Sequence, residues 1–309
     1  MTRKALPGKG ERPLPPWPGQ SVEVDEQRLF VRRTGAGEPA LFVHGLGGSA
    51  TNWTDLMALL ADDYDCRAID LPGFGRSAPP VVGDYSIDTH VSAALGYLRQ
   101  TWDEPVHLFG NSLGGALAVR LAATAPDAVR TLTLVSPALP SYRPRVGSDP
   151  RLPLLLVPGL AAMVTRTLSR HSTSRRTEAI INLCFADPTS LPPERFSEAL
   201  EEMRLRRGMA WYADALTLSL RGLVREFVTP GPASLWRQAA SLRVPTLVVH
   251  GRHDRLVPLA VGTRAARVIP GARLVIAEES GHVAQLEQPH LVADSFLELV
   301  GDLDASARV

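Results

Sequence analysis

The sequence predicts an α/β fold in which a mostly parallel, twisted sheet carries helices on both faces and receives an inserted helical segment. Short apolar runs alternate along the chain with stretches of helical spacing, which is the order of elements in a parallel sheet covered by helices. The alternation stops over residues 137–240, where helical spacing dominates and prolines are frequent, and it resumes afterwards. An all-helical insert between two α/β halves predicts a cap over the strand ends, where open parallel sheets place their sites.

The individual elements follow from local patterns. Short apolar runs predict strands at residues 21–24, 28–33, 40–44, 66–69, 105–109, 130–135, 244–250 and 273–276. Helical spacing predicts helices at residues 52–60, 87–100, 113–125, 259–268 and 289–300. We therefore expect a core over residues 21–136 and 241–309, a helical cap over residues 137–240, and a flexible lead over residues 1–20.

Composition narrows the class of protein. The chain of 309 residues can bury a sizeable core. A net charge of +1 gives no reason to expect a nucleic-acid partner or an anionic membrane. The lead has no apolar stretch typical of a secretory signal, and the longest apolar run, residues 152–164, is too short to span a bilayer. Cys66 and Cys184 are isolated, so we expect free thiols in a reducing, cytoplasmic location.

The cap segment is basic. It holds 14 arginines against 9 acidic residues. Such a surplus indicates either a solvated helical surface or a site that steers anionic substrates, and the sequence leaves both open.

Gly110-Asn111-Ser112-Leu113-Gly114 carries the candidate nucleophile. This single G-x-S-x-G of the chain directly follows the predicted strand PVHLF and directly precedes the predicted helix LGGALAVRLAATA. A serine between strand and helix occupies a tight, strained turn, where larger side chains at the flanking glycines would clash. The helix N-terminus also directs backbone N–H groups toward a developing oxyanion. The alternative is a serine that caps the helix beside packing glycines.

A serine hydroxyl needs a base, and the base needs a carboxylate to orient it. His282 follows the strand RLVIA and is the candidate base. Asp254 follows the strand VPTLVVH, lies between nucleophile and base in chain order, and is the candidate acid; at the end of RTLTLV the chain has Ser136 instead. The other histidines suit the role less well, since they lie in predicted strands, on helices, in the insert or beside the acid: His107, His250, His90, His290, His171 and His253.

The glycine-rich stretch His44-Gly45-Leu46-Gly47-Gly48 follows the strand ALFV. Glycines let the backbone approach a ligand there and supply the second N–H of an oxyanion hole. We assign the two donors to the backbones of Leu46 and Leu113, and we interpret His44 as a brace of this loop. Asp70 and Arg76 of the stretch DLPGFGRS are expected to tie their own loop together. Candidate substrate-binding residues are Gly45, Gly47, Asn111 and Val283.

Five motifs in this order, HGLGG, DLPGFGRS, GNSLGG, GRHDRLVP and SGHVAQLEQP, resemble the α/β-hydrolase superfamily with a helical cap. Members that open epoxides or remove halogens use an aspartate nucleophile. Because this chain has Ser112 at that position, it is not expected to belong to either group. GNSLGG and the stretch around His282 are similar to carbon–carbon bond hydrolases of aromatic catabolism, which cleave vinylogous diketones. Those enzymes usually have Trp after the catalytic His, where this chain has Val283, and they bind a substrate carboxylate with a cap arginine.

The sequence thus favours a serine hydrolase that cleaves a small or medium carboxylic ester through an acyl-enzyme. A carbon–carbon bond hydrolase is the second hypothesis, and a non-catalytic receptor that binds a small ligand under the cap is the third. The triad chemistry implies a small-molecule acyl substrate and neither a metal nor an organic cofactor. The sequence leaves the oligomeric state open.

Overall fold

A computed structural model describes residues 6, 13–82, 84–141 and 172–307. Its strands form one eight-stranded sheet of order β1-β2-β4-β3-β5-β6-β7-β8. The strands are β1 Gly19–Val24, β2 Gln27–Thr34, β3 Glu38–Val43, β4 Tyr64–Asp70, β5 Val106–Asn111, β6 Val129–Val135, β7 Thr246–Gly251 and β8 Arg273–Ala277. β2 pairs antiparallel with β1 and β4, and the remaining neighbours are parallel. The predicted mostly parallel sheet is confirmed.

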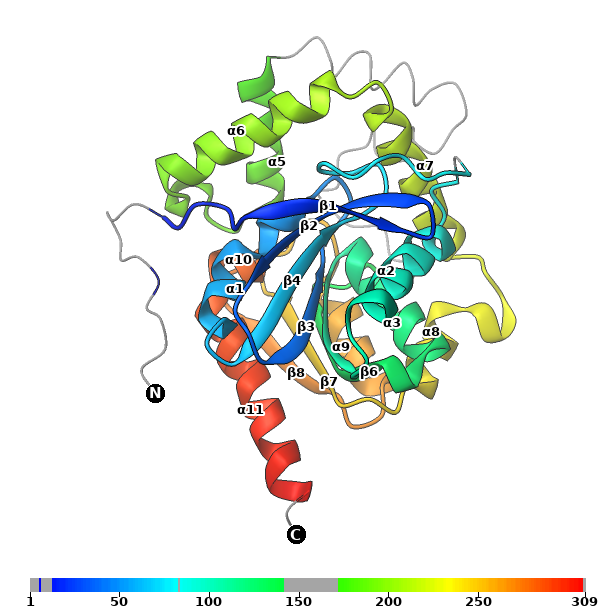
Figure 1. Cartoon of the computed structure of the whole chain (residues 1–309). Coiled ribbons are helices and arrows are strands. Elements are labelled where there is room, and N and C mark those ends of the chain that lie inside the picture. The colour runs from blue at the N-terminus through cyan, green and yellow to red at the C-terminus, as the bar shows by residue number, and fades with distance from the viewer. Residues whose placement is uncertain (1–5, 7–12, 83, 142–171, 308–309) are drawn as a thin grey trace.

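Helices cover both faces of this sheet (Figure 1). One layer consists of α1 Thr54–Leu60, α10 Ala284–Glu287 and α11 Pro289–Ala307, which pack on one another. The other consists of α2 Ile87–Thr101, α3 Leu113–Thr124, α8 Leu235–Ser241 and α9 Leu259–Val268. The short 3-10 helices are η1 Ala50–Trp53, η2 Pro126–Ala128, η4 Pro188–Ser190 and η5 Gly231–Ala233.

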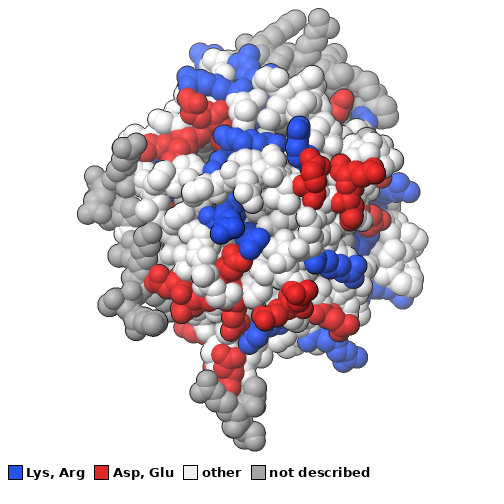
Figure 2. Space-filling view, in the orientation of Figure 1, with Lys and Arg blue, Asp and Glu red and all other residues white. Residues whose placement is uncertain are grey.

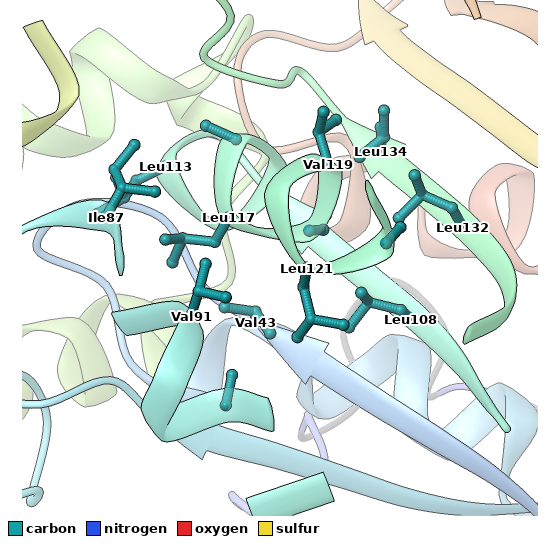
Figure 3. Packing of buried hydrophobic residues seen from close by; sticks show 14 of the residues in the cluster. Val43, Ile87, Val91, Leu108, Leu113, Leu117, Val119, Leu121, Leu132 and Leu134 are labelled. Carbon is teal, nitrogen blue, oxygen red and sulfur yellow. The ribbon is translucent and has the colours of Figure 1, made fainter. Parts of the chain in front are cut away.

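Alternation along the central strands divides the core into two parts. On β3, Leu41 and Val43 face the α2–α3 layer, where they join Val91 and Leu117, while Phe42 faces the α1–α11 layer. Figure 3 shows the first of these parts, with α3 side chains packed between the strands and α2. Because each fully buried side chain of this size contributes about 1.5–3 kcal/mol, the central strands are fixed firmly, and so are the loops at their ends.

The inserted helical region lies between β6 and β7 in the chain. Its described helices before α8 are α5 Thr173–Cys184, α6 Pro193–Gly208 and α7 Tyr212–Arg225, and they lie beyond one end of the sheet (Figure 1). Residues 142–171 of the predicted cap, which include the apolar run 152–164 and His171, lie outside the described residues. The cap boundaries at residues 137 and 240 stay a prediction.

The last residues of the N-terminal lead, which we expect to be flexible, contact the core. Residues 1–5 and 7–12 lie outside the described part of the chain. The end of the lead, however, contacts the core: the Trp17 indole N–H donates to the Thr54 carbonyl at 2.9 Å, and β1 already begins at Gly19. An indole that packs on a core helix offsets the entropy of ordering the short segment before β1.

Surface charge is mixed on the face shown in Figure 2, where acidic and basic side chains alternate. Several cap arginines are held in ion pairs, as with Arg195, which bonds Asp55 on α1 and lies 2.6 Å from Glu198. In the part of the chain that the structure describes, no helix combines the length and the apolar character needed to cross a bilayer. Cys66 and Cys184 are both free thiols, as expected.

Candidate active site

The carboxyl ends of three parallel strands present the three predicted catalytic residues. β5 ends at Asn111 and leads into Ser112, β7 leads into the loop that contains Asp254, and β8 leads into the loop that contains His282. β5, β6, β7 and β8 are consecutive in the sheet, so these loops share one edge. A parallel sheet places the ends of its strands together even when they are far apart in sequence.

Ser112 occupies a strained turn between β5 and α3. Its φ of 55° and ψ of −115° lie in a region that residues other than glycine rarely adopt. A Cβ at Gly110 would lie 2.4 Å from the Gly114 carbonyl oxygen, and a Cβ at Gly114 would lie 2.3 Å from the Val43 carbonyl oxygen. Both glycines are therefore required by close backbone approach, as the G-x-S-x-G pattern predicts. Strain of this kind costs about 1–3 kcal/mol.

His282 and Asp254 form a buried pair. The His282 Nδ1 lies 2.9 Å from Asp254 Oδ2, while Asp254 Oδ1 accepts the N–H groups of Leu256 and Val257 at 2.8 and 2.9 Å. Burial by itself would raise the pKa of Asp254, but the charge and hydrogen bond of His282, with smaller contributions from His250 and the Val257 N–H, hold that pKa below its ordinary value. The carboxylate is thus stabilised in its ionised form, which favours an Nδ1–H tautomer of His282.

Asn111 connects the strand before Ser112 with the His282 loop. Its amide nitrogen donates to the Val135 carbonyl at 3.0 Å and to the His282 carbonyl at 3.1 Å. Both amide hydrogens are therefore used within the protein, and contact of Asn111 with a substrate stays a prediction. The Ser112 hydroxyl forms no hydrogen bond with any residue that the structure describes, which is common at catalytic serines before substrate binds.

The glycine-rich loop after β3 lies against Ser112. A Cβ at Gly45 would come within 3.0 Å of the Ser112 Cβ. His44 braces this loop, because its Nδ1 lies 2.7 Å from the Gly45 carbonyl oxygen and its Nε2 accepts the Leu71 N–H at 3.0 Å. Complete burial lowers the pKa of His44 to about 3, so its ring is neutral at physiological pH.

The two predicted oxyanion donors are available in this arrangement. Leu46 lies in the glycine-rich loop, and Leu113 is the first residue of α3. Among the described residues, neither the Leu46 N–H nor the Leu113 N–H has a hydrogen-bond acceptor. Donors without protein partners at a helix N-terminus and in an adjacent loop suit a developing negative charge.

Asp70 ties the neighbouring loop, as expected from the stretch DLPGFGRS. Its carboxylate accepts the N–H groups of Ala50 and Arg76 at 2.6 and 2.8 Å. The Arg76 side chain has a different partner from the expected one, since its guanidinium donates to Glu202 of α6 at 3.2 Å. A tie between core and cap has no signal in the sequence, because its two halves lie 126 residues apart.

Cap side chains that reach the site could not be found from sequence patterns. A Cβ at Gly47 would lie 3.2 Å from the Tyr212 hydroxyl oxygen and 3.3 Å from Leu216 Cδ1, so α7 lies over the glycine-rich loop. Val283 is buried and packs with Ile181 and Phe185 at the end of α5. Substrate contact by Gly45, Gly47 and Val283 stays a prediction.

A sheet of this topology, with a serine on a strained strand–helix turn and an aspartate–histidine pair at the same edge, is the architecture of an α/β hydrolase. A family model described as "alpha/beta hydrolase fold" matches residues 39–289. The chain therefore belongs to the α/β-hydrolase fold family.

Known proteins support this membership. The chain is 31% identical over 292 residues to a 2-hydroxymuconate semialdehyde hydrolase from a Pseudomonas species, covering 94% of each protein. It is 30% identical over 270 residues to a dihydrolipoyllysine-residue acetyltransferase component of the acetoin cleaving system of Cupriavidus necator, where the match covers 87% of this chain but only 65% of that protein. A putative lipase from Acinetobacter baumannii has the same fold, with a TM-score of 0.75, 21% identity, and coverage of 94% and 92% of the two chains.

Proposed function

We propose that the chain is a serine hydrolase in which Ser112 is the nucleophile, His282 its base and Asp254 the carboxylate that orients the base. The observation that carries this proposal is the 2.9 Å hydrogen bond between His282 and Asp254 at the sheet edge that presents Ser112. A purely binding protein has no need of such a pair. The strained turn at Ser112 supports the same assignment, because strain of this kind gathers at functional sites.

The chemistry follows from this geometry. His282 removes the Ser112 proton as the hydroxyl attacks a carbonyl carbon, and the Leu46 and Leu113 N–H groups bind the oxyanion. Collapse of the tetrahedral intermediate breaks the bond to the leaving group, which takes the proton from His282. Water then repeats the sequence on the acyl-enzyme. Asp254 stabilises the imidazolium that forms at each attack.

We propose further that the bond that is cut joins two carbon atoms, and that the substrate is a vinylogous diketone that carries a carboxylate. The hydroxymuconate semialdehyde hydrolase supports this choice, because the match extends over nearly the whole of both chains. The sequence alone favoured an ester, since Val283 replaces the tryptophan usual in carbon–carbon hydrolases. A diketone of this type must first convert from its dienol to the keto form, after which Ser112 attacks the ketone carbon.

Arg206 on α6 is the best candidate to bind the substrate carboxylate. Its side chain is only 11% exposed, and its nearest acidic group is Glu202 at 3.9 Å. Its Nε has no hydrogen-bond partner among the described residues. Arg206 also lies close enough to His44 to contribute to the lowered pKa of that histidine, after the larger effect of burial. A buried guanidinium with a free donor favours an anionic ligand.

The substrate class is tested by comparing two reactions. We expect kcat/KM for a 2-hydroxy-6-oxo-dienoate to exceed kcat/KM for short p-nitrophenyl esters, because only the first substrate offers a carboxylate to the basic cap. Arg206→Gln should raise KM for the dienoate by about 10- to 100-fold, the usual cost of a lost charge-assisted hydrogen bond. Steady-state kinetics with both substrates provides the measurement.

Arg204→Gln is the matched control, because Arg204 is 59% exposed and paired with Glu201 at 2.8 Å. This variant should keep the KM of the parent. Efficient ester hydrolysis with negligible cleavage of the dienoate would show instead that the protein is a carboxylic ester hydrolase.

Acid pH should reduce activity through a single ionisation. His282 must be neutral to accept the Ser112 proton, and the lowered pKa of Asp254 keeps that carboxylate ionised in the acid range. The logarithm of kcat/KM should therefore fall with a slope of one as the pH decreases. A limb of slope two in the same range, measured by initial rates across pH, would show that Asp254 titrates together with the base.

A further inference from the structure

The end of cap helix α5 is joined to the loop that carries His282. The His282 backbone N–H donates to the Cys184 carbonyl at 2.6 Å. A Cβ at Gly281 would lie 2.4 Å from the same carbonyl oxygen and 2.8 Å from the Ala186 nitrogen. The two segments are thus in backbone contact one residue away from the imidazole of His282.

Glu287 bridges these two segments. Its Oε1 accepts the Ala186 N–H at 2.6 Å and its Oε2 accepts the Gly281 N–H at 2.7 Å. Burial raises the pKa of Glu287, and the N–H groups of Ala186, Gly281 and Asp187 oppose that effect. Charge-assisted hydrogen bonds of this length are the strong ones, so a single carboxylate holds the cap residue and the loop residue together.

Other bonds complete the enclosure of the His282 loop. Asn111 holds the His282 carbonyl from the nucleophile strand, and Asp254 holds the ring. From the loop that carries Asp254, Arg255 donates to the Phe185 carbonyl of the cap at 3.2 Å and also bonds the Asn182 carbonyl. The His282 loop is therefore fixed from the core and from the cap at once.

We propose that Glu287 is a positioning residue that sets the place of the base His282 by fixing its loop to the end of cap helix α5. Glu287 does not touch the reacting atoms. It holds the Gly281 N–H, which lies directly before His282. It also holds the Ala186 N–H, and so fixes the segment whose Cys184 carbonyl accepts the His282 N–H. The position of the α5 end and the position of the base His282 thereby depend on the same carboxylate. The inference rests on His282 as the base and is independent of which bond the enzyme cuts.

Glu287→Gln tests this role. The amide can accept one of the two N–H groups but presents its own NH₂ to the other, so one bond becomes a clash of donors. A displaced base is expected to slow the reaction of Ser112 with a fluorophosphonate probe by about 100-fold, the usual effect of a misplacement of about 1 Å. The thermal midpoint is measured alongside.

Glu278→Gln is the matched control, because Glu278 carries the same charge four residues before His282 but its side chain is 62% exposed and bonds only Arg252 among the described residues. This variant should react at the rate of the parent. Equal rates for Glu287→Gln and the parent would overturn the inference.

A pH profile separates positioning from charge. Glu287 interacts with Asp254 and Cys184, and Arg255 of the Asp254 loop donates to the nearby Phe185 carbonyl. Removing the charge of Glu287 could therefore act on the titration of the site alone. A positioning role lowers the rate at the neutral plateau. An acid limb that moves while the plateau keeps the value of the parent would show a charge effect and contradict the proposal.

Hydrogen exchange provides a second measurement, and its first part is made on the parent protein alone. The Ala186 and Gly281 amides should exchange slowly, and slow exchange in both should be lost in Glu287→Gln but not in Glu278→Gln. Fast exchange of both amides in the parent would overturn the inference even if Glu287→Gln failed to fold. A parent that does not react with the probe at all would instead refute the serine-hydrolase proposal.

Discussion

Replacing Ser112 with alanine is expected to lower kcat by up to about a million-fold, because the members of a triad act as a unit and lose their effect together. The strained backbone at residue 112 does not depend on the hydroxyl, so the fold should be retained. Turnover of a dienoate or a p-nitrophenyl ester measures the loss, and circular dichroism confirms the fold.

Ser136→Ala is the control for this experiment. Ser136 is buried and, like Ser112, has a positive φ; it directly follows the adjacent strand β6. It lacks a neighbouring base in the proposed mechanism, so this variant should retain most of its activity. Near-normal turnover in Ser112→Ala, with a large loss in Ser136→Ala, would move the nucleophile to the adjacent strand.

Asp254→Asn is expected to reduce kcat by about 10⁴-fold while the fold remains intact. The amide can still accept the Leu256 and Val257 N–H groups through its oxygen. Its NH₂ then faces His282 Nδ1, which forces the proton onto Nε2 and leaves no lone pair to accept the Ser112 proton. Single-turnover kinetics measures the loss, and turnover close to that of the parent would mean that another carboxylate orients the base.

The sheet and the strained turn at Ser112 could be predicted from the sequence because their signals are local. Strands such as β3 and β5 are continuous apolar runs, since both faces are buried. Gly110 and Gly114 are required by backbone contacts next to Ser112 itself, so a five-residue pattern locates the turn. Asp254 and His282 each follow a strand, and the rule that parallel strands end at one edge brings them together.

The cap contacts could not be predicted, because each depends on two segments that come together only in the folded chain. The Glu202 carboxylate accepts the Ser49 hydroxyl at 3.2 Å and the Arg76 guanidinium. It lies far from both in sequence, and its helix carries several other charged residues of equal appearance. Glu287 lies on the short helix α10, which the sequence pattern did not distinguish from the loop before α11. Choosing Arg206 among 14 cap arginines likewise required the positions of Glu202 and His44.

Our proposal for the bond that is cut depends on contacts of the same kind. Val283 stands where carbon–carbon bond hydrolases usually have tryptophan, and this side chain packs under α5 with Ile181 and Phe185. The side chains that lie over the glycine-rich loop are Tyr212 and Leu216 of α7. The presence of Val283 in place of tryptophan therefore does not argue against a diketone substrate as strongly as the sequence alone indicates.

The most direct test of the account is to locate the covalent adduct that a fluorophosphonate probe forms with the parent protein. The probe is reacted to completion, the protein is digested, and the modified peptide is sequenced by mass spectrometry. We predict one adduct per chain, on the hydroxyl of Ser112, because only a serine beside a base such as His282 attacks phosphorus readily. An adduct on any other residue, or no adduct on a folded protein, would contradict the assignment of Ser112 as the nucleophile.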